Sequence, residues 1–407
     1  MKTVAIISEY NPFHTGHKHQ IDKIREELGA DTRIVAIMSG NYTQRGEIAI
    51  IDKNTRAKCA VECGVNLVLE LPFPFSSSSA EIFAQSGVKI ADSIGVIDYL
   101  SFGSESGDLE ALSTVAKNMQ DEKFIFALRE YLTSESGRTI GYPVVCQRAY
   151  NEVFSTKLDK NFFASNNILA LEYIKAINKF SSSIKPHTVK RLGADYSELA
   201  ITEELHQSAT AIREMMQKDF ASATKYVPEE TKDILLDAFA SGKAPTNAEA
   251  LASAIITHFR LNPLPQKNDI HDVGGGLYNR LYMQSMRANN INALIQFADT
   301  KKFTTARIRR AIWYSFFGVT SSEALELPLY TQALAMDCVG QTILKAIKKK
   351  SGFPVITKPS ATDMLGDDAK RQKLLADRAD FVFELTRPCP QDAGTALKTT
   401  PYIKKVR

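Results

Sequence analysis

Cysteine is scarce in this 407-residue chain, and its arrangement excludes two structural roles that cysteine often has. The five cysteines are odd in number and form no CxxC pair, so they provide neither a zinc knuckle nor a disulfide framework. Two of them lie four residues apart on an expected helix and are interpreted as buried apolar thiols. The pattern predicts a reducing compartment. The positions are Cys59, Cys63, Cys146, Cys338 and Cys389.

Long apolar runs are also missing. No stretch of about 18 apolar residues occurs, so the sequence predicts no membrane-spanning helix. Residues 1–7 run directly into an apolar, strand-like segment and lack the charged start and small-residue cleavage site of a signal peptide. We therefore expect a cytoplasmic protein without membrane contact.

An excess of charge of one sign is the third missing feature. The chain has 50 Lys and Arg against 46 Asp and Glu, a net charge of +4, which is too small to indicate a nucleic-acid binder by itself. The distribution of the basic residues therefore matters more than their total. With 407 residues, of which 44% are hydrophobic, the chain is long enough for two cores.

The first half of the sequence alternates apolar strand-like runs with amphipathic helical patterns. Strands are expected at residues 4–8, 32–38, 67–71 and 99–103, and helices at 16–28, 55–63 and 79–94. Strands that are apolar on both faces and joined by helices indicate a parallel sheet covered on both sides. The fold class predicted for residues 1–200 is a Rossmann-like, doubly wound α/β domain.

The second half is mainly helical in pattern. Before it come a helix at 162–176 and one more strand at 185–192, and Ser208 is expected to cap the next helix. Proline-rich residues 262–265 interrupt the helices, residues 333–349 are predicted to form a helix with a basic end, and residues 354–357 a short strand. We predict a boundary near residue 200 and a mainly α-helical domain over 201–407.

The segment that carries the clearest chemistry is His14-Thr15-Gly16-His17, directly after the first strand. In open α/β sheets ligands bind at the carboxyl ends of strands, where a helix N-terminus offers free N–H groups to phosphate. Two imidazoles three residues apart can converge on a triphosphate and stabilise charge as it develops. An isolated pair of this kind is more often a cap or a surface feature, but the preceding strand and the following helix favour a nucleotide site. A metal site is disfavoured because no third ligand follows at helical spacing.

Two further polar segments follow strands, at residues 39–46 and 102–105, and each suits either nucleotide binding or an ordinary loop. In the second half a basic cluster could neutralise RNA phosphates, although a solvated charged face is equally consistent with it. The aromatic side chains behind the cluster, Trp313, Tyr314 and Phe316, are expected to pack in a helical core. The cluster consists of Lys301, Lys302, Arg307, Arg309 and Arg310.

Taken together, these segments resemble the bacterial tRNA(Met) cytidine acetate ligase family, relatives of the HxGH nucleotidyltransferases. The resemblance covers nearly the whole chain. Besides the basic cluster, it is carried by Glu9-Tyr10-Asn11-Pro12-Phe13-His14-Thr15-Gly16-His17, Ser39-Gly40-Asn41-Tyr42-Thr43-Gln44-Arg45-Gly46-Glu47, Glu70-Leu71-Pro72-Phe73, Phe102-Gly103-Ser104-Glu105, Asn166-Asn167-Ile168-Leu169, Lys190-Arg191 and Ser208-Ala209-Thr210-Ala211-Ile212-Arg213.

The resemblance implies an enzyme that forms N4-acetylcytidine at the wobble position of elongator tRNA(Met) from acetate and ATP, through acetyl-adenylate. It implies His14 and His17 as catalytic residues, Mg²⁺ on the ATP phosphates, and the basic cluster as the tRNA contact, and it leaves open which asparagine of the 166–167 pair contacts ATP. The implied ATP residues are Ile7, Ser8, Glu9, Tyr10, Asn11, Pro12, Phe13, His14, Thr15, Gly16, His17, Lys18, His19, Gln20, Gly103, Asn166, Asn167 and Arg191.

Two alternatives remain at this point. A plain nucleotidyltransferase would move AMP onto a small phosphorylated metabolite, but it would need neither a large helical half nor a basic helix. A noncatalytic RNA-binding protein would use the α/β domain only as a scaffold. An intact His14-Gly16-His17 constellation argues against this second alternative, because no packing role requires it. The sequence does not reveal the oligomeric state or the features by which a tRNA would be selected.

Overall fold

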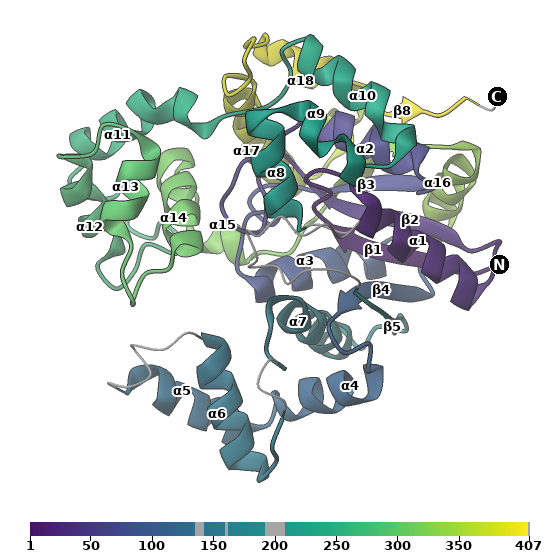
Figure 1. Cartoon of the computed structure of the whole chain (residues 1–407), viewed down its shortest axis with the longest axis horizontal. Helices are drawn as coiled ribbons and strands as arrows, with labels where there is room; N and C mark the ends of the chain where they lie inside the picture. Colours follow the sequence, from purple (N-terminus) through teal and green to yellow (C-terminus); the bar gives the residue numbers. More distant parts are fainter. Residues whose placement is uncertain (135–141, 159–161, 192–207, 406–407) are drawn as a thin grey trace.

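The computed structural model describes residues 1–134, 142–158, 162–191 and 208–405. Its centre is a mostly parallel sheet (Figure 1), in the order β5-β4-β1-β2-β3-β6-β7, with β8 paired to β6. Among the described strands β3 and β6 form the one antiparallel pair, and β7 and β8 run parallel to β6. The strands are β1 (Thr3–Ser8), β2 (Arg33–Ser39), β3 (Leu67–Leu71), β4 (Tyr99–Ser104), β5 (Lys185–Lys190), β6 (Thr331–Met336), β7 (Val355–Ile356) and β8 (Tyr402–Ile403).

The central strands are buried on both faces, as their continuous apolar sequences predict. Along β1, Val4 and Ile6 belong to one core cluster, whereas Ala5 and Ile7 belong to the other, because successive side chains point to opposite faces. One face is covered by α3 (Ala80–Ser93), α4 (Leu109–Asn118), α7 (Ser165–Lys179) and α16 (Cys338–Lys350), and the other by α1 (Thr15–Leu28), α2 (Lys53–Glu62), α8 (Ala209–Lys218) and α10 (Glu229–Ala240). The predicted doubly wound α/β fold is confirmed.

The described residues after 208 are mainly helical, as predicted, and Ser208 caps α8 through its hydroxyl, which accepts the N–H of Ala211 at 3.2 Å. Four helices gather in a lobe beside the sheet (Figure 1): α11 (Ala252–Leu261), α12 (Leu277–Ser285), α13 (Ile291–Ala298) and α14 (Thr305–Phe317). They share one apolar core with α17 (Asp367–Glu384). The remaining helices are α5 (Glu122–Thr133), α6 (Tyr142–Phe154), α9 (Phe220–Ala223), α15 (Ser321–Leu325) and α18 (Ala393–Lys398).

One predicted element is wrong in part. Residues 333–349 were expected to form a single helix, but β6 ends at Met336 and α16 begins only at Cys338. The apolar run of β6 pairs with β3, and Asp337 then caps α16 by accepting the N–H of Gly340. A short run of apolar residues fits both a strand buried on its two faces and a buried turn of helix. The periodicity of the sequence therefore does not distinguish the two.

The chain returns to the sheet after the helical lobe, because β6 and β8 come from the C-terminal half. The predicted boundary near residue 200 lies within 192–207, outside the described residues, and the division into 1–200 and 201–407 stays a prediction. Among the described helices none is long and apolar enough to cross a membrane.

Candidate active site

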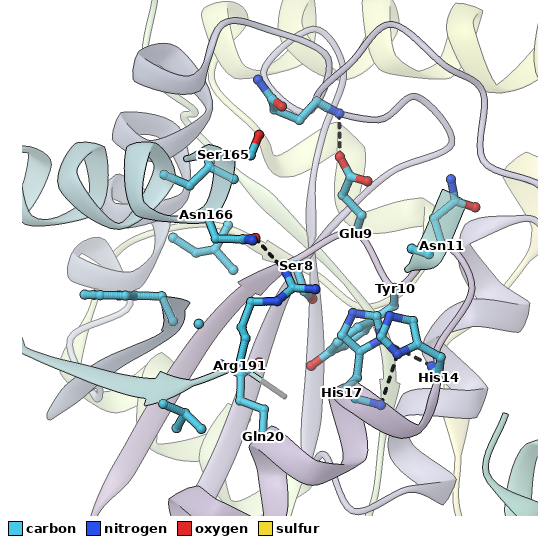
Figure 2. A pocket seen from close by; sticks show the side chains of 18 of the residues that line it. Ser8, Glu9, Tyr10, Asn11, His14, His17, Gln20, Ser165, Asn166 and Arg191 are labelled. Carbon is cyan, nitrogen blue, oxygen red and sulfur yellow. Dashed lines mark hydrogen bonds between the residues drawn. The ribbon is translucent and has the colours of Figure 1, made fainter. Parts of the chain in front are cut away.

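A cavity of about 200 Å³ opens at the carboxyl ends of β1, β4 and β5. This is the edge of an open α/β sheet where ligands bind. Figure 2 shows the cavity between the turn from β1 into α1 on one side and the start of α7 with Arg191 on the other. The fold therefore brings together residues from Ile7 to Ala209, about 200 positions apart in the sequence.

His14 and His17 form the N-terminal cap of α1. His14 occupies the N-cap position, where its Nδ1 accepts the N–H of Gly16 at 3.1 Å, and His17 Nδ1 accepts the N–H of His14 at 3.2 Å. The two rings stack with centroids 3.7 Å apart (Figure 2). Because both Nδ1 atoms act as acceptors, each neutral ring must carry its proton on Nε2. In the neutral form each imidazole therefore has the tautomer in which Nε2–H is available as a donor.

His17 is held in the neutral form. Burial lowers the pKa of His17 well below its usual value, and the neighbouring His14 and Arg191 lower it further by repulsion. The rings of Tyr10 and Phe13 pack on His17, with centroid distances of 4.8 and 5.4 Å. The imidazole therefore has a fixed position and a fixed tautomer, which is the preorganisation that electrostatic catalysis requires.

The opposite wall is organised by Glu105. Its carboxylate accepts the backbone N–H groups of Asn166 and Asn167 at 3.3 and 2.9 Å, at the start of α7. It also accepts the side-chain amide of Asn166 at 2.8 Å, and the carbonyl of that amide accepts Arg191 Nη1 at 2.6 Å (Figure 2). Glu105 thereby orients Asn166, which in turn orients the guanidinium of Arg191 beside the cavity.

Gly103 lets the aliphatic stem of Arg191 lie close to the end of β4. A Cβ atom at residue 103 would lie 3.1 Å from Cγ of Arg191, closer than ordinary van der Waals contact. Asn167 has a different role from its neighbour. Asn167 is 2% exposed; its Oδ1 accepts the N–H of Glu105, and its amide donates to the carbonyl of Phe162. It therefore links the segment after β4 to the segment that precedes α7.

Most of the predicted ATP residues line the cavity. They are Ile7, Ser8, Glu9, Tyr10, Asn11, His14, Gly16, His17, His19, Gln20, Gly103, Asn166 and Arg191. The structure places the others away from its lining: Phe13 is packed in the apolar core, Lys18 pairs with Glu230 at 2.7 Å, and Pro12, Thr15 and Asn167 do not face the cavity.

Several lining residues were not predicted. Gln44 and Arg45 reach the cavity from the loop after β2; Gln44 donates its backbone N–H to Glu9 at 2.9 Å, and Arg45 donates to the hydroxyl of Ser165. The sequence left two interpretations of residues 39–46, nucleotide binding or an ordinary loop, because nothing local shows which way a loop folds. Phe83, Phe102, Ser165, Leu169, Tyr173, Val189, Lys190 and Ala209 complete the lining.

The loop that carries Gln44 and Arg45 is held by Arg56, whose side chain is 1% exposed. Its guanidinium donates to four backbone carbonyls, those of Glu9, Ser39, Gly40 and Ile51. Burial lowers the pKa of Arg56 to about 10, so it stays charged at neutral pH. One side chain therefore ties the turn after β1 to the loop after β2.

A buried ionic cluster holds the other end of this loop. Lys53 Nζ lies 2.7 Å from a carboxylate oxygen of Glu70 and also contacts Asp380 of α17. Asn41 bridges the same elements, donating to Asp380 and accepting the N–H of Lys53. A C-terminal helix thus positions a loop of the N-terminal sheet.

The predicted basic cluster divides between two surfaces. Arg307 and Arg310 both pair with Asp272, whereas Arg309 pairs with Glu47 on the opposite side. Lys302 donates to the carbonyl of Gly275, and Lys301 is exposed. Of the aromatic residues behind the cluster, Trp313 and Tyr314 pack in the core of the lobe, as expected, and Phe316 is half-buried and packs against it.

Comparisons with known proteins agree with this geometry. The family model described as HIGH Nucleotidyl Transferase matches residues 1–394. The tRNA(Met) cytidine acetate ligase of Caldanaerobacter subterraneus is 40% identical over 364 residues, covering 88% of this chain and 89% of the relative, and that of Thermoanaerobacter sp. (strain X514) is 37% identical with the same coverage.

Solved structures extend the similarity to three dimensions. TmcAL of Thermotoga maritima, in a crystal structure with alpha-thio ATP, superposes with a TM-score of 0.88 at 30% identity and covers 99% of both chains. The apo form of the same protein gives a TM-score of 0.90 at 29% identity. With a matching fold, a matching family model and relatives this similar over nearly their full length, the chain belongs to the tRNA(Met) cytidine acetate ligase family of HIGH-type nucleotidyl transferases.

Proposed function

We propose that the chain activates acetate with ATP and transfers the acetyl group to the 4-amino group of the wobble cytidine in elongator tRNA(Met). The observation that carries the proposal is the cavity in which the capped His14–His17 pair faces Arg191 and Arg45 across the carboxyl ends of the strands. Imidazole N–H donors and guanidinium groups are suited to the oxygens of a triphosphate.

In the first half-reaction an acetate oxygen attacks the α-phosphorus of ATP, the bond to the bridging oxygen breaks, and diphosphate leaves. Negative charge grows on the nonbridging oxygens and on the leaving group. The Nε2–H groups of His14 and His17 would stabilise that charge, because hydrogen bonds to an oxygen strengthen as it becomes more negative. The product is acetyl-adenylate, a mixed anhydride.

In the second half-reaction the cytidine N4 attacks the acetyl carbonyl carbon, the bond to the phosphate oxygen breaks, and AMP leaves as N4 loses a proton. No covalent enzyme intermediate is needed, so positioning supplies most of the catalysis. Asn166 is the asparagine of the pair that we assign to ATP, since it faces the cavity while Asn167 is buried in the turn.

The tRNA contact is proposed to lie on the helical half, with Arg309 the best placed of the basic residues. It is anchored to Glu47, two positions from Arg45 of the ATP cavity. Arg307 and Arg310 face Asp272 instead, which neutralises part of their charge. They would contribute at a greater distance from the reacting base. We also propose that the protein acts on tRNA in the cytoplasm.

Magnesium is expected on the ATP phosphates by analogy with other ATP-dependent enzymes. Among the described residues that line the cavity Glu9 is the one carboxylate, and it already accepts the N–H of Gln44. In the described ranges no group of three or more His, Cys, Asp or Glu side chains could hold a metal ion. The residues therefore do not form a dedicated magnesium site, and we assign no step to the ion.

The test is ATP–diphosphate exchange by the purified protein with acetate and with other small carboxylates, followed by mass spectrometry of elongator tRNA(Met) incubated with ATP and labelled acetate. We expect exchange that depends on acetate and label on one cytidine. If none of the carboxylates supports exchange, the proposal is overturned, and transfer of AMP to a phosphorylated metabolite is favoured instead.

A further inference from the structure

A second, larger cavity lies beside the ATP cavity, with a free volume of about 870 Å³. We call it the amide groove. Its walls come from the loop at residues 46–50, from α8, from residues 245–250, from the start of α13, from α14 and from residues 386–388. It therefore runs between the sheet and the four-helix lobe that stands beside it in Figure 1.

The amide groove and the ATP cavity share a wall one loop thick. Arg45 lines the ATP cavity and Gly46 lines the groove; in the same way Ala209 lines the cavity and Thr210 the groove. The loop lies directly against α14, because a Cβ atom at residue 46 would come within 2.7 Å of the backbone nitrogen of Arg310. A polymer lying in the groove can thus reach the ATP cavity by passing over a single turn of chain.

Two arginines lie next to this wall. Arg213 and Arg309 both pair with the one carboxylate of Glu47, and the charges of the lining balance, because Arg387, Glu214 and Glu249 line the groove as well. Arg213 also donates to the carbonyl of Asn11, in the turn that precedes His14. At the other end of the groove the carboxylate of Glu249 is satisfied by two backbone N–H groups at the start of α13.

The groove also presents uncharged amides. Gln217 of α8 and Asn292 of α13 are both exposed and line it from opposite sides. Gln217 lies one helical turn beyond Arg213, so both side chains project from the same face of α8. Amide side chains offer a donor and an acceptor together, the combination that pairs with the edges of nucleobases.

We propose that the amide groove holds the unpaired nucleotides that flank the acetylated cytidine, with Arg213 and Arg309 at a backbone phosphate and Gln217 and Asn292 at base edges. The inference rests on the proposed function and specifies where its RNA substrate lies. Unpaired RNA fits best, because its bases can turn toward a protein surface, whereas the deep groove of an RNA duplex hides them. The cytidine itself would cross the Arg45–Glu47 wall into the ATP cavity.

The test uses Gln217→Ala and Asn292→Ala, which remove exposed amides outside the ATP cavity. Gln341→Ala is the matched control, since Gln341 is an exposed glutamine on α16, away from the groove. Two quantities are measured for each protein: kcat/KM for elongator tRNA(Met) in acetylation, and the rate of acetate-dependent ATP–diphosphate exchange without tRNA. Binding of the anticodon stem-loop of that tRNA is followed by fluorescence anisotropy.

We expect each groove variant to lose about five- to tenfold in kcat/KM for tRNA and in affinity for the stem-loop, the effect of about one hydrogen bond, with exchange unchanged. The control should match the wild type in all three measurements. If exchange is normal and both groove variants acetylate tRNA like the wild type, the groove does not hold the RNA and the inference is overturned. Absence of exchange in the wild type would instead refute the proposed function itself.

Discussion

The two nitrogens of His17 have separable roles, and this leads to a sharp prediction. Nδ1 accepts the N–H of His14 and so caps α1, while Nε2–H is the donor that would meet the phosphates. An asparagine at this position places its Oδ1 near the position of Nδ1 but has nothing at the position of Nε2. His17→Asn therefore keeps the cap and removes the donor, whereas His17→Ala removes both.

The magnitudes follow from these contacts. Loss of one preorganised donor to a developing charge costs about 2.7–4 kcal/mol, or roughly 10²–10³ in rate. Loss of a helix cap costs about 1 kcal/mol of stability. We expect both variants to lose about 10²–10³ in kcat for ATP–diphosphate exchange with little change in KM for ATP, since the interaction strengthens mainly in the transition state.

The stability of the two variants should differ. His17→Asn should unfold in urea with nearly the wild-type free energy, and His17→Ala should be about 1 kcal/mol less stable. Exchange by His17→Asn at more than about a tenth of the wild-type rate would refute the assignment of Nε2 as a catalytic donor. Loss of both exchange and tRNA binding in folded His17→Ala would count against the separation of the two sites.

Four further predictions concern the surrounding residues. Asn166→Ala should raise KM for ATP by about tenfold, whereas Asn167→Ala should mainly lower stability by about 1–3 kcal/mol, as buried hydrogen bonds are lost; equal effects on KM would contradict the separation of their roles. Arg309→Ala should weaken tRNA binding by about tenfold in a gel-shift assay and leave the rate of ATP–diphosphate exchange unchanged. Because the pKa of His17 is depressed in the folded state, the unfolded chain takes up the proton first as the pH falls below about 6.5. The free energy of unfolding should therefore fall by about 1.4 kcal/mol per pH unit more steeply in the wild type than in His17→Asn, and parallel slopes would argue against a neutral His17. Lys53→Met leaves two buried carboxylates unpaired and should cost about 3–5 kcal/mol in urea unfolding; a loss below about 1 kcal/mol would show that the cluster tolerates an uncompensated charge.

The sheet of the N-terminal half was predictable because its signals are local. The run Leu67–Leu71 is apolar at every position except Glu70 and became a strand with the same bounds, and Ser208 capped α8 as its side chain and position indicated. The HxGH segment was equally readable, since a strand, a turn and a helix start are contiguous in sequence. The prediction of a single helix over residues 333–349 was wrong because an apolar run fits a buried strand as well as a buried helix.

The sequence by itself determined the α/β class, the place of the histidine pair between a strand and a helix, and the family resemblance, all of which depend on contiguous residues. Tertiary structure alone decided which residues meet across the cavity. It turned Asn166 toward Arg191 and buried Asn167, although the two are adjacent, and it divided the basic cluster so that Arg309 faces Glu47 while Arg310 faces Asp272. The direction of a side chain depends on which distant backbone packs against its helix, and that information is not present in any local stretch of sequence.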